Sequence, residues 1–359
     1  MNIVYIVEDY SENGGVERIV SMKANFLVAE NQNQVTLVSI YEDSRPYQYS
    51  LDANIPFVLL NVPFASKVDN PIYKLYSRVK TLLLAAYRLN KVLEQIQPDI
   101  IFFTTTLGAL LLPLCHTKAR KIYESHLSRS FNPYHTLFRW MEKNADAIVC
   151  LTEEDAHEFK YTKDVRVIPN FVHAPTAFVN DYSCKKAIAV GRLEQQKGFD
   201  RLIKCWKVIA EQYPDWKLDI YGEGSLHEIL QSQIEALCLE QQVTLCGRCE
   251  KMMDKYPNYS LHVMSSHYEG QPIVLIEAQA CGLPSVSFDF KYGASDIVKK
   301  NHNGILVKQD DEPAFTDAIM KMMANAHLRQ EYGTNAIEMV KKYSQEHIMK
   351  QWQELILEK

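Results

Sequence analysis

The sequence contains two successive sets of short apolar segments, and in each set these segments alternate with stretches of helical spacing. The first segment, Asn2–Val7, is apolar almost throughout, which is typical of a parallel strand covered on both faces. A glycine turn and a helical pattern follow it. The further strands predicted in this set are Gln34–Ile40, Phe57–Leu60, Asp99–Thr104, Lys121–Glu124, Ala147–Leu151 and Val165–Ile168. Because strands that alternate with helices form parallel sheets, the first half predicts a doubly wound α/β domain.

The second set starts after a break in this pattern. Two prolines interrupt the periodicity between Ile168 and Pro175, and it stays weak to about Cys184. The strands predicted after the break are Lys186–Val190, Trp216–Tyr221, Val243–Cys246, Leu261–Ser265, Pro284–Phe288 and Ile305–Val307. Helical spacing fills the gaps, and the tail from about Leu328 predicts two more helices. The second half therefore repeats the α/β plan of the first.

The chain length agrees with this division, since 359 residues are many for a single compact core. We expect an N-terminal domain over residues 1–172, a linker over 173–184 and a second domain over 185–338. A C-terminal helix over 339–359 is expected to pack back toward the N-terminal domain.

Composition and charge exclude several classes of protein. The formal net charge of -5 gives no basic face for nucleic acid. The first ten residues lack the basic region and the cleavage site of a signal peptide, and no apolar run is long enough to span a membrane. The eight cysteines are scattered, which favours reduced thiols, and the single Cys-x-x-Cys pair, Cys246 with Cys249, lacks further zinc ligands at matching spacing. We expect a cytoplasmic protein.

A glycine turn follows the first predicted strand of each half. Neither has the G-x-G-x-x-G pattern of a dinucleotide-binding loop, and the chain has no Walker A motif. The second turn reads GRLEQQKG from Gly191 to Gly198, with Arg192 and Lys197 at the carboxyl end of a strand, where open α/β sheets bind ligands. An arginine fork and a lysine point charge predict neutralisation of a diphosphate without a metal. The alternative is a solvated Lys/Arg pair at the start of a helix.

The segment from Ser266 to Pro284 reads SHYEGQPIVLIEAQACGLP and places two carboxylates around a short apolar helix, predicted over Pro272–Cys281. Glu277 lies inside this helix, where a carboxylate is costly unless another group pairs with it. Glu269 lies just before the helix N-terminus, where backbone N–H groups attract anions. This combination suits a sugar nucleotide, whereas a buried ion pair is the alternative for Glu277.

These motifs, in this order, resemble glycosyltransferase family 4. The resemblance rests on GGVE at 14–17, GRLEQQKG at 191–198 and EGQPIVLIEAQACGLP at 269–284, and it covers nearly the whole chain. It implies the GT-B architecture, in which two Rossmann-like domains, one for the acceptor and one for the nucleotide-sugar donor, face each other across a deep interdomain cleft. It also implies a retaining reaction and similarity to bacterial surface-polysaccharide transferases.

The resemblance implies a role for each matching position. Arg192 and Lys197 would hold the donor diphosphate and stabilise its charge as it leaves. Glu277 would accept hydrogen bonds from the ribose, and Glu269 from the transferred sugar. The remaining implied donor contacts are Gly14, Gly15, Gly270 and the backbone N–H groups of Ile273 and Val274.

His126 follows the predicted strand Lys121–Glu124 and matches the family's position near C6 of the transferred sugar. The catalytic set implied by the resemblance is therefore Glu269, His126, Arg192 and Lys197. A structural histidine is the alternative, and Glu124 could be its outer partner, which the sequence does not decide. Gln271 departs from the family pattern, since many relatives have an aromatic or apolar residue there.

The implied reaction transfers a hexose or an N-acetylhexosamine from a UDP-sugar to a glycan or a lipid-linked glycan in polysaccharide biosynthesis. The acceptor hydroxyl would attack from the face that the diphosphate leaves. No Asp-x-Asp motif stands in a predicted strand-end loop, so we expect no metal and no other cofactor. The alternatives are a sugar-nucleotide epimerase of the same fold and a non-catalytic nucleotide-sugar-binding partner subunit.

One segment of the first half predicts a membrane contact. Ser66–Leu93 has six basic residues against one acidic residue, with tyrosines and leucines between them. A basic, aromatic, amphipathic stretch can lie on an anionic bilayer, which indicates a peripheral contact with the inner face of the plasma membrane. A core-packing helix with a solvated basic face is the alternative.

Overall fold

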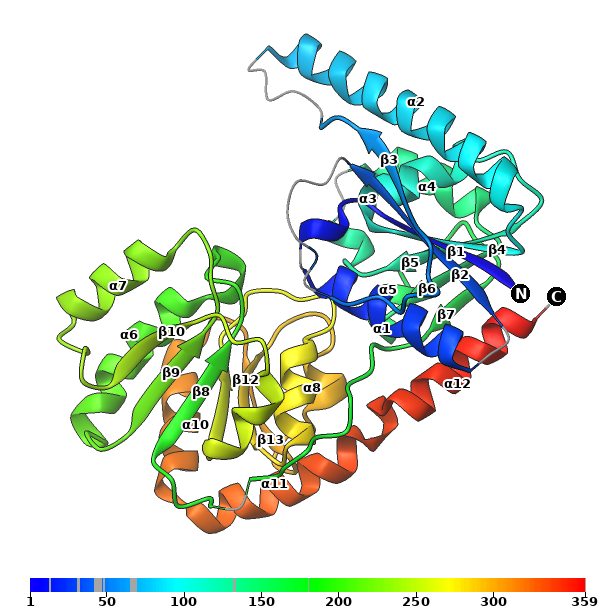
Figure 1. Cartoon of the computed structure of the whole chain (residues 1–359). Coiled ribbons are helices and arrows are strands. Elements are labelled where there is room, and N and C mark those ends of the chain that lie inside the picture. The colour runs from blue at the N-terminus through cyan, green and yellow to red at the C-terminus, as the bar shows by residue number, and fades with distance from the viewer. Residues whose placement is uncertain are drawn as a thin grey trace. The chain divides into compact units, whose positions relative to one another are not determined.

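The protein consists of two α/β units, each built on one parallel sheet (Figure 1). The computed structural model describes residues 1–12, 14–30, 33–41, 47, 49–64, 70–131, 134–179 and 181–358. Unit 1 comprises Met1–Ile168 together with Gln351–Lys359, and unit 2 comprises Pro169–Lys350. The predicted α/β class is therefore confirmed.

Unit 1 contains a seven-stranded sheet in the order β3-β2-β1-β4-β5-β6-β7. Its strands are β1 (Asn2–Val7), β2 (Gln34–Tyr41), β3 (Phe57–Val62), β4 (Ile100–Thr104), β5 (Arg120–Ser125), β6 (Ala147–Cys150) and β7 (Val165–Val167). The chain leaves β1 toward β2 on one side and returns to β4 on the other. The carboxyl ends of β1 and β4 thus mark the switch point at which open α/β sheets bind ligands.

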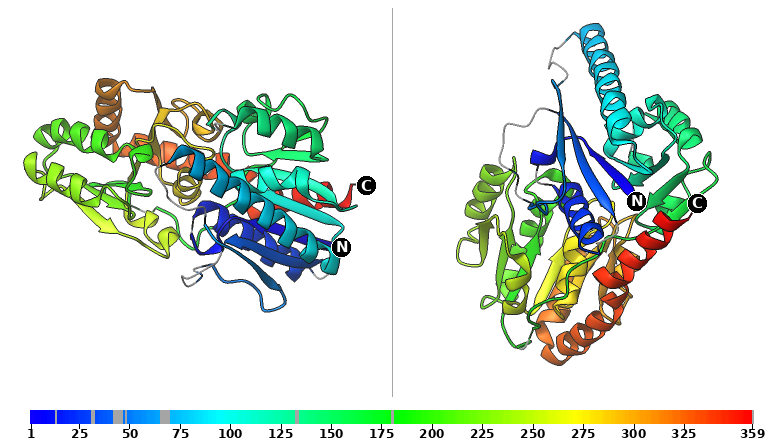
Figure 2. Two further views of the ribbon diagram at one scale, coloured as in Figure 1. Left: turned by 90° about the horizontal axis from the view of Figure 1, so that it is seen from above. Right: turned by 45° about the vertical axis from the view of Figure 1, so that its right-hand side comes forward.

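In the described part of unit 1, five α-helices connect these strands, and a sixth joins the unit from the C-terminus. They are α1 (Gly15–Ala29), α2 (Pro71–Ile96), α3 (Thr105–Leu111), α4 (His135–Asn144), α5 (Glu153–Ala156) and α12 (Gln345–Leu357). The long helix α2 packs its C-terminal half on the sheet, because Ala85, Leu89 and Leu93 are buried. Its N-terminal half extends past the strands (Figure 2).

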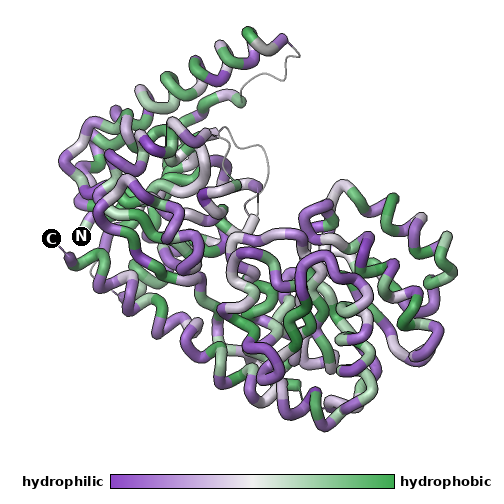
Figure 3. Tube along the Cα trace, turned by 180° about the vertical axis from the view of Figure 1, so that it is seen from behind, coloured by the Kyte–Doolittle hydropathy of each residue, from purple (hydrophilic) through white to green (hydrophobic). Residues whose placement is uncertain are grey.

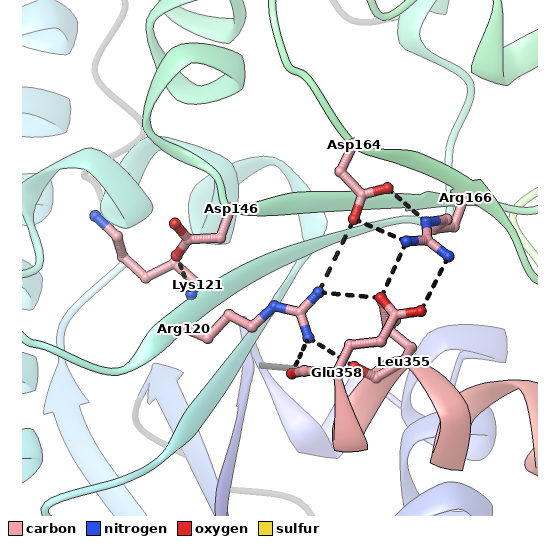
Figure 4. A network of polar contacts seen from close by, with 7 residues as sticks. All are labelled: Arg120, Lys121, Asp146, Asp164, Arg166, Leu355 and Glu358. Carbon is pink, nitrogen blue, oxygen red and sulfur yellow. Dashed lines mark hydrogen bonds and ion pairs between the residues drawn. The ribbon is translucent and has the colours of Figure 1, made fainter.

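The end of α12 is fastened to unit 1 by apolar and polar contacts. Trp352 packs edge-on against Phe102 of β4, with 5.6 Å between ring centroids. Arg120, the first residue of β5, donates from Nη1 to the carbonyl oxygens of Leu355 (2.6 Å) and Glu358 (3.1 Å). Figure 4 shows this network, in which Nη2 of Arg166 also lies 3.0 Å from Oε2 of Glu358.

Unit 2 contains a six-stranded sheet in the order β10-β9-β8-β11-β12-β13. Its strands are β8 (Lys186–Val190), β9 (Lys217–Tyr221), β10 (Val243–Gly247), β11 (Leu261–Met264), β12 (Ser285–Asp289) and β13 (Gly304–Lys308). Its helices are α6 (Phe199–Gln212), α7 (His227–Ala236), α8 (Ile273–Ala280), α9 (Ala294–Ile297), α10 (Glu312–Ala324) and α11 (Ala326–Val340). The switch point of this sheet lies between β8 and β11.

Candidate functional site

The turn from Gly191 to Gly198 leaves the carboxyl end of β8 at the switch point of unit 2. It packs so closely against the turn after β9 that only glycine fits there: Gly222 has φ 148°, and a Cβ on it would lie 1.8 Å from the carbonyl oxygen of Gly191. A Cβ on Gly224 would lie 2.5 Å from the carbonyl oxygen of Leu193. The glycines at 222 and 224 therefore support the turn that presents Arg192 and Lys197.

Lys197 and Glu269 form an ion pair at this switch point. The Nζ atom of Lys197 lies 2.7 Å from Oε1 and 3.0 Å from Oε2 of Glu269, which follows β11, the strand beside β8. The Ser266 hydroxyl donates to Oε1 at 2.6 Å, and the Gln196 amide lies 3.3 Å from Oε2. The side chains are 15% and 7% exposed, so the pair lies at the border of solvent.

Arg201, in the first turn of α6, holds the two segments of this site in register. It donates from Nε to the carbonyl oxygen of Ser265 (2.8 Å) and from Nη2 to that of Ser266 (2.7 Å). The Ser265 hydroxyl in turn donates to the carbonyl oxygen of Lys197 at 2.9 Å. Gly198 makes this approach possible, since it has φ 62° and a Cβ on it would lie 2.3 Å from the oxygen of Ser265. Sequence reasoning missed Arg201; the available signal was its place on the same helix face as buried Cys205.

Arg192 lies on the same turn but is exposed, and its Nη2 is 3.4 Å from Oε1 of Gln196. Hydrogen bonds from the backbone N–H and hydroxyl of Ser225, with a smaller effect of Arg192, hold the pKa of Glu194 below its ordinary value. The turn is thus braced at Glu194, while the guanidinium of Arg192 is directed to solvent.

Glu277 is 1% exposed inside α8, and its Oε2 lies 3.4 Å from the Tyr256 hydroxyl. The helix begins one residue later than predicted, because Pro272 is the N-cap residue rather than the first helical residue. Gly270 lies half-buried before it. The Ile273 N–H donates to the carbonyl oxygen of Gln271 at 3.0 Å, so a phosphate at this amide would replace that bond. Val274 follows in the first turn of α8.

Gln271, which departs from the family pattern, has a structural partner. Its buried side chain accepts the Asn170 backbone N–H at 2.7 Å through Oε1. The amide therefore fastens the segment before α8 to the start of unit 2, a contact that an apolar residue could not make.

In unit 1, Gly14 and Gly15 follow β1 at its switch point. Gly14 is the N-cap residue of α1, and its N–H donates to Oε2 of Glu17 at 3.0 Å. A Cβ on Gly14 would lie 2.7 Å from that oxygen, whereas a Cβ on Gly15 would meet no described atom within 4 Å. A side chain at 14 would thus have to displace the Glu17 carboxylate, whereas packing gives no reason for the glycine at 15.

His126 follows β5, at the same sheet edge. Its Nε2 lies 3.2 Å from Oε2 of Glu124, which decides the question that the sequence left open: Glu124 is the partner of this histidine. The residues around it are also held by Asp155. Its carboxylate accepts the Arg129 N–H at 2.7 Å and the Ser125 hydroxyl at 3.0 Å.

The structure thus joins Lys197 to Glu269 within unit 2 and places Arg192 on the same turn. Gly14, Gly15 and His126 lie at the corresponding edge of the unit 1 sheet. Among the described residues, no group of three or more His, Cys, Asp or Glu side chains could hold a metal ion. In the same part of the chain, no helix combines the length and apolarity needed to span a membrane.

Comparison with known proteins places the chain in a family. Residues 13–174 match the sequence model described as Glycosyltransferase Family 4, and residues 180–339 match that of Glycosyl transferases group 1. The amylovoran biosynthesis glycosyltransferase AmsD of Erwinia amylovora is 28% identical, with 99% of each chain covered.

A second relative acts on a lipid-linked glycan. It is the GalNAc-α-(1→4)-GalNAc-α-(1→3)-diNAcBac-PP-undecaprenol α-1,4-N-acetyl-D-galactosaminyltransferase of Campylobacter jejuni, 26% identical over 100% of this chain and 99% of its own.

A solved structure has the same fold. A variant of S. aureus TarM, crystallised with UDP, fondaparinux and α-GlcNAc-glycerol, superimposes with a TM-score of 0.78 at 18% identity, and the match covers 99% of this chain and 100% of that one. The two parallel-sheet units of the structure correspond to the two sequence models that match the chain. The chain therefore belongs to glycosyltransferase family 4 and is a glycosyltransferase with the GT-B fold.

Proposed function

We propose that this glycosyltransferase transfers a hexose or an N-acetylhexosamine from a UDP-sugar to a glycan or lipid-linked glycan in polysaccharide biosynthesis, with retention of configuration. The observation that carries the proposal is the Lys197–Glu269 pair, 2.7 Å apart, at the switch point of unit 2 beside Arg192. Two relatives support it: the TarM crystal contained UDP, and the C. jejuni enzyme acts on an undecaprenol diphosphate-linked glycan.

In this proposal the ion pair opens when the donor binds. A diphosphate has more negative charge than the Glu269 carboxylate, so it competes for Lys197, while exposed Arg192 closes on it from the same turn. Glu269, still held by the Ser266 hydroxyl, is then free to accept hydroxyls of the sugar. Glu277 would bind the ribose, and the α8 N-terminus with Gly270, Ile273 and Val274 the phosphates.

The chemistry requires positioning and electrostatic stabilisation rather than a protein nucleophile. The acceptor hydroxyl attacks the anomeric carbon from the face that UDP leaves. As the bond between the anomeric carbon and the phosphate oxygen breaks, that oxygen takes the hydroxyl proton. From unit 1, His126, Gly14 and Gly15 would contact the transferred sugar and the acceptor. Arg192 and Lys197 supply the positive charge, so we propose that the reaction needs no metal or other cofactor, which turnover in excess EDTA would test.

A thermal-shift screen across nucleotide sugars tests the donor site. A UDP-sugar at a hundred times its dissociation constant should add about 2.7 kcal/mol of stability to the wild type. Lys197→Ala should lose this response, and Lys185→Ala should keep it, because Lys185 pairs with exposed Asp215 before β8 at the other sheet edge. The donor site is wrong if no UDP-sugar stabilises the wild type, or if both variants respond alike.

Mass spectrometry of a UDP-sugar and an acceptor glycan then identifies the reaction. A glycosylated acceptor supports transfer, an epimerised donor indicates the epimerase, and stabilisation without turnover indicates a non-catalytic subunit.

We also propose that α2 contacts an anionic membrane surface. Residues 66–69 of the predicted segment lie outside the described residues, but the N-terminal half of α2 exposes large apolar side chains among basic ones. Figure 3 shows hydrophobic and hydrophilic positions alternating along this helix. Ile72, Leu75 and Tyr76 are 77%, 64% and 64% exposed. This stripe of apolar side chains comprises Ile72, Tyr73, Leu75, Tyr76, Val79 and Leu83, and exposed Tyr87 continues it into the C-terminal half. The C-terminal half is the core-packing helix that was the alternative.

Sedimentation with phosphatidylglycerol vesicles at low salt tests this contact. The wild type should bind them, and a variant with Ile72→Asp and Tyr76→Asp should not. Ile229→Asp is the matched control, since Ile229 of α7 is 61% exposed but isolated from the stripe in sequence and unit. Equal binding of the wild type and the double variant would contradict the proposal.

A further inference from the structure

A buried chain of three titratable side chains lies beneath His126 in unit 1. The Lys23 ammonium of α1 contacts Oε2 of Glu124, and Nε2 of His126 lies 3.2 Å from the same oxygen. The side chains of Lys23, Glu124 and His126 are 1%, 3% and 8% exposed. One carboxylate oxygen is thus shared by a lysine and a histidine, away from solvent.

We propose that Glu124 is a positioning residue that fixes the ring and the tautomer of His126, with Lys23 as its buried counter-charge. A carboxylate accepts but does not donate, so a neutral His126 keeps its proton on Nε2 and leaves Nδ1 as the acceptor of the ring. This inference rests on the proposed function, which assigns His126 to the transferred sugar. Its consequence is that His126 offers the sugar an acceptor, suited to a hydroxyl donor.

The charges around Glu124 favour its ionised form. Burial alone would raise the pKa of Glu124, but the Lys23 ammonium and then His126 hold it below its ordinary value. Burial lowers the pKa of Lys23, and Glu124 opposes that effect. Lys23 also lies 4.1 Å from the centroid of the Trp352 ring, a favourable position for a cation. The end of α12 therefore covers the pair and excludes water from it.

A second buried pair in unit 1 shows why stability does not explain this arrangement. Both oxygens of Glu142 are used: Oε1 accepts from Nε of Arg129 at 3.0 Å, and Oε2 accepts the N–H groups of Lys160 and Tyr161. By contrast, Oε1 of Glu124 is buried and has no hydrogen-bond partner among the described residues. Glu142 ties backbone together, whereas the contacts of Glu124 go to two side chains, Lys23 and His126.

The backbone on either side of His126 is held separately. Asp155 accepts the Arg129 N–H through Oδ1 and the Ser125 hydroxyl through Oδ2, at 2.7 and 3.0 Å. With the flanking backbone fixed by Asp155, the remaining freedom of His126 is rotation of its side chain. The contact with Glu124 removes that freedom.

Nitrogen NMR of the full chain with labelled histidines tests the proposal, since the ring shifts report which nitrogen bears the proton. In the wild type His126 should be the Nε2–H tautomer, and a His126→Gln spectrum assigns the signal. Lys23→Met with Glu124→Leu replaces the pair by apolar groups, and should abolish this tautomer preference and lower kcat about 10- to 100-fold, the range found for the outer partners of metal-binding histidines. KM for the donor should change little.

Two further variants separate positioning from folding. Lys23→Met with Glu124→Gln restores an acceptor and should recover part of both the tautomer preference and kcat. Glu142→Gln perturbs the other buried pair and should leave the His126 tautomer unchanged. An Nδ1–H tautomer in the wild type would overturn the proposal, and this result does not depend on the stability of any variant. Equal tautomer preference and kcat in the Leu and Gln variants at 124 would also overturn it. If His126→Gln keeps full turnover, the proposed function of His126 fails, while the tautomer still decides the role of Glu124.

Discussion

Each unit has a lysine–glutamate pair near the carboxyl end of its sheet, and the two pairs differ in their access to solvent. Lys197 and Glu269 of unit 2 are 15% and 7% exposed, and the carboxylate has further polar partners in Ser266 and Gln196. Lys23 and Glu124 of unit 1 are 1% and 3% exposed and lie under Trp352. We propose that the same chemical pair serves two purposes: the pair of unit 2 is exchanged for a ligand, and the pair of unit 1 is fixed.

The difference has a physical basis in the desolvation of charge. A pair at the solvent border loses little when it opens, because water and a diphosphate replace the lost contact. A buried pair that loses one partner leaves an uncompensated charge in a medium of low dielectric constant. Substitution of single partners should therefore affect binding in unit 2 and folding in unit 1.

The largest expected effect is on the folding of unit 1. Lys23→Met should lower the free energy of unfolding by about 3–5 kcal/mol, because Glu124 remains buried without its counter-charge. Urea unfolding followed by circular dichroism measures this, and Lys197→Met is the control, with a smaller expected loss, because Glu269 keeps its hydrogen bonds to Ser266 and Gln196. Similar losses of unfolding free energy in the Lys23 and Lys197 variants would show that the two pairs do not differ in this way.

The same pair predicts a pH dependence. The pKa of Glu124 is lower in the folded chain than its ordinary value. The contribution of Glu124 to stability is therefore complete at a pH above the ordinary pKa, and it is lost as the pH falls through the folded pKa. The difference in unfolding free energy between wild type and Glu124→Gln should therefore shrink on acidification below about 4.5. A difference that stays constant from neutral pH to pH 3 would show that Glu124 is not ionised in the folded protein.

A smaller effect is expected for the residue that holds the exchangeable pair in register. Arg201→Met should cost about 1.5–3 kcal/mol of stability, since it removes charge-assisted bonds to Ser265 and Ser266, and it should also weaken UDP binding. The matched control is Arg329→Met: Arg329 is likewise buried and donates to the carbonyl oxygens of Tyr182 and Met322. Both variants should lose stability, but only Arg201→Met should lose affinity in calorimetric titration with UDP.

The smallest effect on stability separates packing from ligand contact at the first glycine turn. Gly15→Ala should raise the unfolding free energy by about 0.4–1 kcal/mol, because α1 begins at this residue and a Cβ meets open space. Its transfer rate should nevertheless fall if a ligand approaches there. Gly14→Ala, whose Cβ would meet Glu17, should lose both stability and rate, so an unchanged rate in Gly15→Ala would remove Gly15 from the site.

The sequence predicted most of the strands because a parallel strand buried on both faces is a continuous apolar run. Asn2–Val7 and Lys186–Val190 agree with the structure at both ends. Element ends differ where a cap decides them, as at Pro272. The family resemblance also supplied the candidate residues in each half, but not which of them are partners.

Pairing could not be predicted, since it depends on contacts between distant positions. Lys23 reads as an ordinary residue of an amphipathic helix, and its contact with Glu124 spans 101 positions. Lys197 and Glu269 were both expected at the donor, yet nothing in their segments shows that each neutralises the other. Gln271 was a departure without a reason until its bond to Asn170 explained it.

We propose that the Lys197–Glu269 pair is the exchangeable one and that its lysine binds the donor diphosphate. The decisive measurement is calorimetric titration with UDP of the wild type, of Lys197→Ala, and of the Lys23→Met variant with Glu124→Gln. We predict that Lys197→Ala weakens binding by at least about tenfold, the loss of one charge-assisted contact, while the unit 1 variant binds as the wild type does. Equal affinity of the wild type and Lys197→Ala would contradict the claim.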